Sequence, residues 1–193
     1  LLAGAQMIAA QRRAHDERVP VLFGKSDHAR DAFEELRLSL QRTGGPRVDV
    51  VFRCYDDAIA FRYEVPRQGG LDELRLQHEG TSFGIAGNPV AYVQYLENHT
   101  TSHEHRVTTV PCSDLATGTL IDLPATFAVS GGRCLSITEA ALRHYAGMSL
   151  RRDVGAHDLV CVLTPRADGL EVVRATPLVT PWRVVLVVDR PGA

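Results

Sequence analysis

Glu139 carries the side chain in this sequence that is best placed for chemistry. It stands in "SITEAALRHYAGM", residues 136–148, where Ser136 and Glu139 have the S-x-x-E spacing of a helix capping box and Gly147 is suited to end a short helix. The flanking segments "RCLSIT" and "MSLRRD" instead have the pattern of strands. Because strand ends and the loops after them often display functional side chains, three readings stay open here: a cap, a solvated charge and a functional carboxylate.

A second candidate is the segment "HTTSHEH", which contains His99, His103, Glu104 and His105. On a strand, His103 and His105 would share one face, where two imidazoles can bind one zinc ion. The spacing identifies no third ligand, and the surrounding Thr and Ser residues are typical of an exposed strand. We therefore favour an exposed strand over a metal site.

Adjacent carboxylates occur at Glu34–Glu35 and at Asp56–Asp57. Neighbouring side chains on a strand point to opposite faces, so these pairs are poorly arranged for acid–base catalysis and indicate a surface and a turn. The sequence has no G-x-S-x-G, H-E-x-x-H, P-loop or G-x-G-x-x-G motif.

The cysteines are widely spaced along the chain. None forms a C-x-x-C pair, which argues against zinc, and the spacing leaves their disulfide status open. Three of them lie in apolar, strand-like segments where buried thiols are common: Cys54, Cys134 and Cys161.

Composition limits the classes of function. The chain has 193 residues, 45% of them hydrophobic, and a formal net charge of −2 with both signs mixed along it. This pattern favours neither a nucleic-acid nor a membrane-surface partner, and no apolar run reaches the roughly 18 residues of a membrane-spanning helix. The chain begins at Leu1 rather than Met and ends at "DRPGA", so we expect it to be a fragment of a longer protein.

The elements that must position Glu139 are strands. Apolar and polar residues alternate in 47–55 and 59–65 around the Asp56–Asp57 turn, which predicts a hairpin. Further strands are predicted at 35–41, 73–79, 82–86, 90–96, 103–110, 123–130, 133–138, 148–154, 159–165, 170–176 and 182–189. Many short strands with turn signals and at most short helical turns predict an all-β sandwich or barrel, in one domain over 1–193. In that context 139–147 is expected to be a turn.

Several sequence blocks occur in an order that resembles a known family. These are "AFRYEVP" after the Asp-Asp turn, "HEGTSF", "SITEAALRHYAGMSL" and "LTPRADGLEVVRATPLVTPWRVVLVVDRPG". Together they resemble the N-terminal domain of glycoside hydrolase family 97, a family of α-glucosidases and α-galactosidases. Four residues depart from the family pattern: Ala58, Cys134, His144 and Ala146.

The resemblance implies a β-sandwich of the galactose-mutarotase-like type that packs against a (β/α)₈ barrel following it in the same polypeptide. It implies that Glu139 reaches the active site and ligates calcium together with glutamates of the barrel. It also implies an α-linked oligosaccharide substrate and export to the periplasm or the medium. The catalytic carboxyl pair of a glycosidase would lie in the barrel, so this chain alone is not expected to be a competent enzyme or to bind calcium tightly.

Two other functions stay open. One is a non-catalytic carbohydrate-binding or structural sandwich, with Glu139 as a surface or capping residue. The other is a mutarotase-like epimerase. That chemistry needs a glutamate base with histidine partners, and only the segment His103–His105 supports it.

Overall fold

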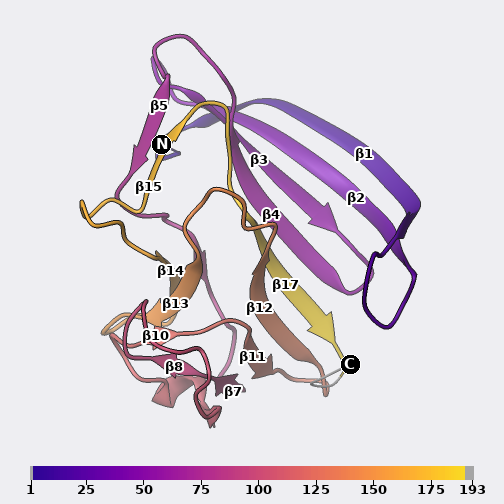
Figure 1. The fold of residues 1–193 in the computed structure, drawn as a ribbon, viewed down its shortest axis with the longest axis vertical. Helices are drawn as coiled ribbons and strands as arrows, with labels where there is room; N and C mark the ends of the chain where they lie inside the picture. Colours follow the sequence, from indigo (N-terminus) through magenta and orange to yellow (C-terminus); the bar gives the residue numbers. More distant parts are fainter. Residues whose placement is uncertain (1, 190–193) are drawn as a thin grey trace. The chain divides into compact units, whose positions relative to one another are not determined.

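Short segments of alternating polarity make this chain fold into antiparallel strands. The structure, a computed structural model, describes residues 2–189 (Figure 1). Within these residues the helical content is one 3₁₀ turn, η1 (Cys112–Asp114), and the strand pairs inside each of the two units described below are antiparallel. The all-β prediction is confirmed. No helix in the described part is long and apolar enough to cross a membrane.

The chain folds into two compact units. Among the described residues, unit 1 contains 2–72 and 176–180, and unit 2 contains 73–175 and 181–189. The expectation of one domain over 1–193 stays a prediction.

Unit 1 is an antiparallel sheet with the strand order β1-β2-β3-β4, and a short strand, β16, pairs with β4. Its strands are β1 (Gln6–Pro20), β2 (His28–Gln41), β3 (Arg47–Cys54), β4 (Ala58–Val65) and β16 (Leu178–Val179). The predicted hairpin is confirmed as β3–β4, and the Tyr55 N–H closes its turn by donating to the Ala58 carbonyl at 2.8 Å.

One face of the unit 1 sheet carries arginine–carboxylate pairs. Glu35 on β2 accepts hydrogen bonds from Arg13 and Arg53 at 2.6–2.9 Å. On the neighbouring strands, three arginines (Arg37, Arg47 and Arg62) contact two carboxylates (Asp49 and Glu64). Because strand neighbours alternate between faces, the exposed Glu34 points away from the buried Glu35, as predicted.

Unit 2 contains the remaining strands. They are β5 (Glu73–Leu76), β6 (Ser82–Phe83), β7 (Val90–Val93), β8 (Tyr95–Leu96), β9 (Thr108–Pro111), β10 (Leu120–Ile121), β11 (Ala125–Ala128), β12 (Cys134–Ala140), β13 (Met148–Arg152), β14 (Leu159–Leu163), β15 (Val172–Ala175) and β17 (Trp182–Val188). One sheet of the unit has the order β17-β12-β11-β7-β9 and another β6-β14-β13-β10-β8, while β15 pairs with β5.

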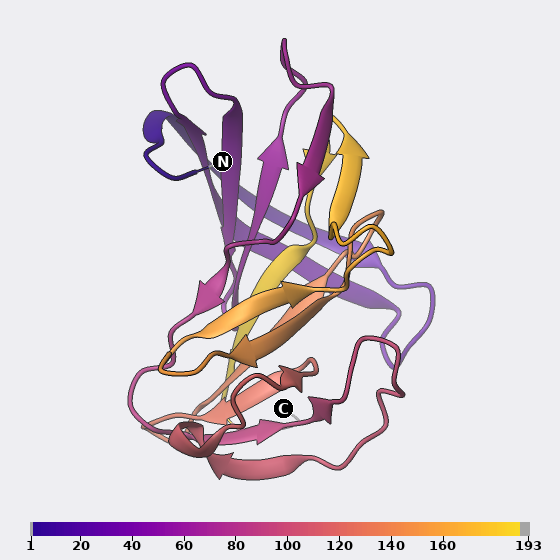
Figure 2. The same cartoon turned by 90° about the vertical axis from the view of Figure 1, so that its left-hand side faces the viewer.

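The two larger sheets of unit 2 form layers around a core. The β13–β14 pair lies beside β12 and β17 in Figure 1 and in front of them in Figure 2. Phe127 and Ile137 are 0% and 1% exposed on one sheet, and Leu150 and Leu163 are 0% and 1% exposed on the other. Burial of these faces on each other is the main stabilising contribution to the unit and fixes the strands that hold Glu139.

Three expectations differ from the structure. The longest strand, β1, was not predicted: its residues are almost all exposed, so its sequence lacks the period of two that a half-buried strand shows. Cys54 is exposed rather than buried, because it is the last residue of β3.

The third difference concerns the histidine segment. His103 and His105 do not lie on a strand, since β9 begins only at Thr108. The segment is a loop held by Gln94, which donates to the His103 carbonyl at 2.7 Å and accepts from the His105 N–H at 3.1 Å. The premise that both imidazoles share a strand face is therefore wrong.

Candidate functional site

Glu139 lies at the end of a strand. This agrees with the sequence prediction of a strand followed by a turn, and not with the alternative of a capped helix. It is the penultimate residue of β12, and Arg183 on β17 stands directly opposite it. Directly opposed residues of an antiparallel pair have Cβ atoms roughly 5 Å apart. This register lets Arg183 Nη1 donate to Glu139 Oε2 at 2.7 Å.

The turn after Glu139 is unusual in its backbone. Ala141 and His144 have φ angles of 57° and 56°, in the left-handed region, which is uncommon for residues other than Gly, Asn, Asp and His and is therefore most unusual at Ala141. The turn is tied at its far end, where Thr164 N–H donates to the Gly147 carbonyl at 3.0 Å and Met148 N–H donates to Glu139 Oε1 at 3.1 Å. Such strain tends to gather at functional sites, which draws attention to this turn.

Arg183 is the organising residue of the site. Its side chain is 0% exposed, although a buried guanidinium is costly unless it is paired and hydrogen-bonded. Nε and Nη2 form a fork on the two carboxylate oxygens of Glu79, at 2.9 and 2.7 Å. Arg183 therefore bridges two glutamates, Glu79 through the fork and Glu139 through Nη1.

Glu79 is the buried partner of this bridge. Besides the fork, it accepts a hydrogen bond from Thr81 Oγ1 at 2.8 Å and one from the Tyr145 hydroxyl at 3.1 Å. Burial alone would raise the pKa of Glu79, but the hydrogen bonds and charge of Arg183 outweigh burial and hold that pKa below its ordinary value. Burial, followed by the charge of Glu79, raises the pKa of Tyr145, which therefore stays a neutral donor.

The two glutamates differ in their free acceptor capacity. An ionised carboxylate has about four acceptor sites. Glu79 uses four, for Arg183 Nε, Arg183 Nη2, Thr81 and Tyr145. Glu139 uses two, for Arg183 Nη1 and Met148 N–H, and its side chain is 15% exposed. Glu139 is thus the member of the set that can still bind a cation.

An open depression of about 550 Å³ runs beside the turn and is lined by Tyr145, Gly147, Thr164, Glu171 and Arg174 among others. Arg174 Nε donates to the His144 carbonyl at 3.0 Å, which holds the turn against β15. The Oε2 atom of Glu171 is buried and has no hydrogen-bond partner. Burial raises the pKa of Glu171 above its ordinary value.

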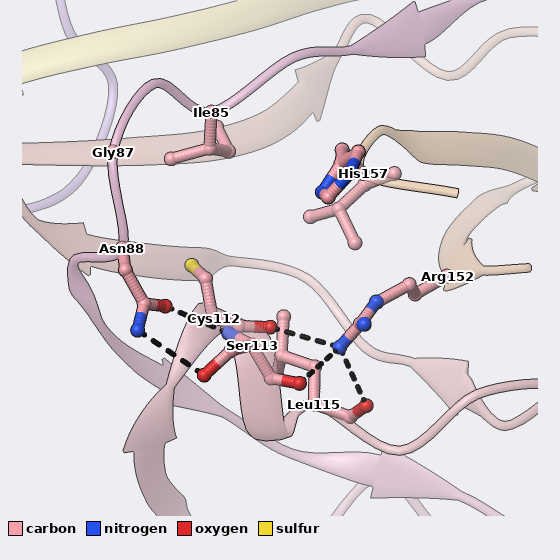
Figure 3. A pocket seen from close by; sticks show the side chains of 9 residues that line it. Ile85, Gly87, Asn88, Cys112, Ser113, Leu115, Arg152 and His157 are labelled. Atoms are coloured by element: carbon pink, nitrogen blue, oxygen red, sulfur yellow. Dashed lines mark hydrogen bonds between the residues drawn. The ribbon is translucent and has the colours of Figure 1, made fainter. Parts of the chain in front are cut away.

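A smaller hollow of about 280 Å³ elsewhere in unit 2 is built around η1 (Figure 3). Arg152 Nη1 donates to the carbonyls of Cys112, Ser113 and Leu115 at 3.0, 2.7 and 3.2 Å. Asn88 exchanges two hydrogen bonds with Ser113. Burial raises the pKa of the Cys112 thiol, which makes it a weak nucleophile. These polar groups hold the turn together, and we assign them no chemistry.

The other candidates from the sequence are dispersed. His103 Nδ1 contacts Asp122 Oδ2 at 2.8 Å in its loop. In the described part of the chain no group of three or more His, Cys, Asp or Glu residues could hold a metal ion. All four cysteines are free thiols, and Cys134 and Cys161 are buried as predicted.

Glu79 and Arg183 were missed as functional residues, although the sequence carries a signal for each. Arg183 is the one charge in the apolar run "PWRVVLVV", and Glu79, in "HEGTSF", is the last residue of the strand predicted at 73–79. A lone charge in a run that must be buried requires a partner of opposite sign. That reasoning identifies the need for an ion pair, but it does not identify which glutamate supplies it.

Comparisons with known proteins agree on one family. A family model described as "Glycosyl-hydrolase 97 N-terminal" matches residues 1–193. The chain is 28% identical over 193 residues to a "Probable retaining alpha-galactosidase" of Streptomyces bingchenggensis, covering 98% of this chain and 28% of that protein. It is 26% identical over 170 residues to a "Retaining alpha-galactosidase" of Bacteroides thetaiotaomicron, covering 83% and 25%.

Solved structures give the same result. A glycoside hydrolase family 97 enzyme from Pseudoalteromonas sp. strain K8, in complex with acarbose, superposes with a TM-score of 0.85 and 26% identity over 97% of this chain and 28% of that chain. A beta-arabinopyranosidase, at 24% identity and a TM-score of 0.83 over 96% of this chain and 32% of its own, shares the fold. The chain spans about a quarter of the length of the curated relatives it matches.

Proposed function

The chain belongs to the family of glycosyl-hydrolase 97 N-terminal domains, and from that membership we propose that it is the N-terminal sandwich of a calcium-dependent, exo-acting α-glycosidase. In this proposal a (β/α)₈ barrel of the same polypeptide carries the catalytic carboxyl groups and this chain contributes Glu139 to the active site. The curated relatives are named as retaining α-galactosidases, which supports an α-linked sugar substrate.

The free acceptor capacity of Glu139 is the observation that carries the proposal. Calcium takes six to eight oxygen ligands, among which carboxylates are preferred. Glu139 has two acceptor sites left after binding Arg183 and Met148, and it sits on a rigid strand end. The donor chemistry fits calcium, and since no three-ligand group occurs in residues 2–189, the other ligands would come from the barrel.

The residues of this chain would act by positioning. When bound, the divalent ion supplies positive charge that stabilises developing negative charge on a substrate oxygen. The N–H of Met148 and the guanidinium of Arg183 fix both oxygens of Glu139. A fixed ligand needs no reorganisation when the cation binds.

A structural role for Glu139 is the second candidate, because it already forms an ion pair with a buried arginine. In that case the domain would only stabilise the barrel or bind carbohydrate. The two roles predict different responses to the same substitution.

The test is Glu139→Gln in the full-length protein. We expect calcium affinity to fall by more than about 10-fold, the lower end of the loss on removing a residue that only supports a metal ligand, and kcat to fall with it, because the amide has no charge to offer the cation. Calcium affinity is measured by isothermal titration calorimetry and activity with an aryl α-glycoside.

Glu64→Gln is the matched control, because Glu64 is 16% exposed and accepts a hydrogen bond from Arg37 at 2.7 Å. It should keep the calcium affinity of the wild type. If Glu139→Gln and Glu64→Gln bind calcium equally well, the structural role is correct. Mutarotation by the isolated domain would instead favour an epimerase.

A further inference from the structure

The site contains more negative than positive charge. Arg183 contributes one guanidinium, whereas Glu79 and Glu139 contribute two carboxylates. Thr81 and Tyr145 complete the shell of Glu79 with neutral hydroxyl groups. When both glutamates are ionised, the group formed by Glu79, Glu139 and Arg183, called the Arg183 set below, has a net charge of −1.

Two carboxylate sets of unit 1 have the opposite balance. Two arginines, Arg13 and Arg53, contact Glu35. Three arginines contact the pair Asp49 and Glu64, as described for unit 1. In these two sets of unit 1 the carboxylates are fully compensated by arginine. The Arg183 set departs from this pattern.

The hydrogen bonds indicate where the uncompensated charge resides. Glu79 holds the fork of Arg183 and has all its acceptor sites filled, so its charge is the one that the guanidinium neutralises. Glu139 receives a single bond from Nη1 and is more exposed, 15% against 6% for the side chain of Glu79. The negative charge therefore remains available on Glu139.

We propose that Arg183 is a positioning residue for Glu139, and that Glu79 is the counter-ion that keeps Arg183 from cancelling the charge of Glu139. Arg183 orients the carboxylate through one hydrogen bond, while its own charge is taken up by Glu79. The set presents one oriented, negatively charged carboxylate to a divalent cation. This inference rests on the proposed function, in which Glu139 ligates calcium.

Two substitutions in the full-length protein test it. Arg183→Lys keeps the charge but lacks the planar fork, so it cannot hold both glutamates at once. Glu79→Gln keeps the shape but removes the counter-ion, so the charge of Arg183 falls on Glu139. We expect each to weaken calcium binding about tenfold, the usual scale for residues that orient a ligand. The readout is the calcium Kd from isothermal titration calorimetry, with the thermal midpoint in chelator as a measure of folding.

Arg37→Lys is the matched control, since Arg37 also bridges two carboxylates, Asp49 at 3.1 Å and Glu64 at 2.7 Å. It should lower the thermal midpoint without changing the calcium Kd. In a Glu139→Gln background, Arg183→Lys should have no further effect on the Kd, because the ligand that it orients is gone. A merely structural arginine would not show this dependence on Glu139.

The outcomes separate the two proposals. If Glu139→Gln weakens calcium binding but Arg183→Lys and Glu79→Gln do not, the positioning role is overturned and the proposed function stands. If Glu139→Gln leaves the Kd unchanged, both proposals are overturned. Should Arg183→Lys fail to fold, Glu79→Gln and the milder Tyr145→Phe, which removes one bond to Glu79, decide the question by the same comparison.

Discussion

The buried carboxylates of Glu35, Asp49 and Glu79 are stabilised by arginine, and Glu79 shares its partner Arg183 with Glu139. The burial of Arg183 at 0% exposure makes sense only with Glu79 in place, because an unpaired buried guanidinium costs several kcal/mol. At the scale of single residues, Glu79 therefore neutralises the charge of Arg183, and Glu139 keeps its negative charge.

The same pairing predicts a pH dependence of stability at Glu35. Hydrogen bonds from Arg13 lead the shift, and with Arg53 they lower the pKa of Glu35 from 4.5 to about 2 against the effect of burial. A carboxylate whose pKa is lowered by folding contributes stability that is present above its unfolded pKa, and that contribution is lost as the pH falls from about 4.5 to about 2.

We expect Glu35→Gln to be less stable than the wild type at pH 7 and the difference to shrink toward pH 2–3. As the pH approaches about 2, the folded wild-type residue also becomes protonated, and its attraction to Arg13 and Arg53 is lost. Urea unfolding at a series of pH values measures the difference in unfolding free energy. A difference that stays constant with pH would show that Glu35 stabilises the fold by shape and not by charge.

At the scale of elements, the strand β12 and the turn after it present Glu139. The turn holds two non-glycine residues at positive φ, and Ala141 comes two residues after Glu139. The turn connects β12 and β13, whose sheets lie in different layers of unit 2. The left-handed residues allow the chain to cross between these layers directly after Glu139.

The strain at Ala141 is tested by replacing two neighbouring alanines, Ala140 and Ala141, with glycine. The two substitutions should change the free energy of unfolding in opposite directions. Ala141→Gly should stabilise the protein by about 1 kcal/mol, because glycine adopts positive φ without the Cβ penalty. Ala140→Gly, at the last position of β12, should destabilise it by about 0.5–1 kcal/mol, because glycine loses more backbone entropy in a strand. Thermal and urea unfolding compare the two variants. Destabilisation by both would mean that the turn is not strained at Ala141.

The sequence predicted most strands of this fold but not all of its elements. The hairpin β3–β4 was found because its apolar residues alternate around Asp56–Asp57. The strand β1 was missed because its faces are both exposed, and pairing with β2 rather than burial holds it in place. The histidine segment was predicted to be a strand, but it is a loop held by two hydrogen bonds between the Gln94 side chain and the backbone of His103 and His105. Such hydrogen bonds leave no local pattern in the sequence.

The site was predicted in part for a similar reason. Glu139 could be selected from its position at the end of a predicted strand and from the family resemblance. Its partner Arg183 lies 44 residues away along the chain and Glu79 lies 104 residues from Arg183, so only strand pairing and folding of the intervening loops bring them together. Neither distance leaves a periodic signal in the sequence.

At the scale of the whole molecule, the chain belongs to the family of glycosyl-hydrolase 97 N-terminal domains. It matches relatives over about a quarter of their length, and its described residues contain no metal site of three or more ligands. In the proposed function, the chain contributes to catalysis by completing a site that other residues begin.

The most direct test of that contribution is a crystal structure of the full-length protein grown with calcium. We predict that a Glu139 oxygen lies about 2.3–2.6 Å from the ion, the usual range for calcium. Arg183 Nη1 should still donate to Glu139, and Glu79 should lie outside the coordination sphere with its fork intact. A calcium ion bound only by residues outside this chain, with Glu139 bonded to Arg183 and Met148 alone, would contradict the assigned role of Glu139.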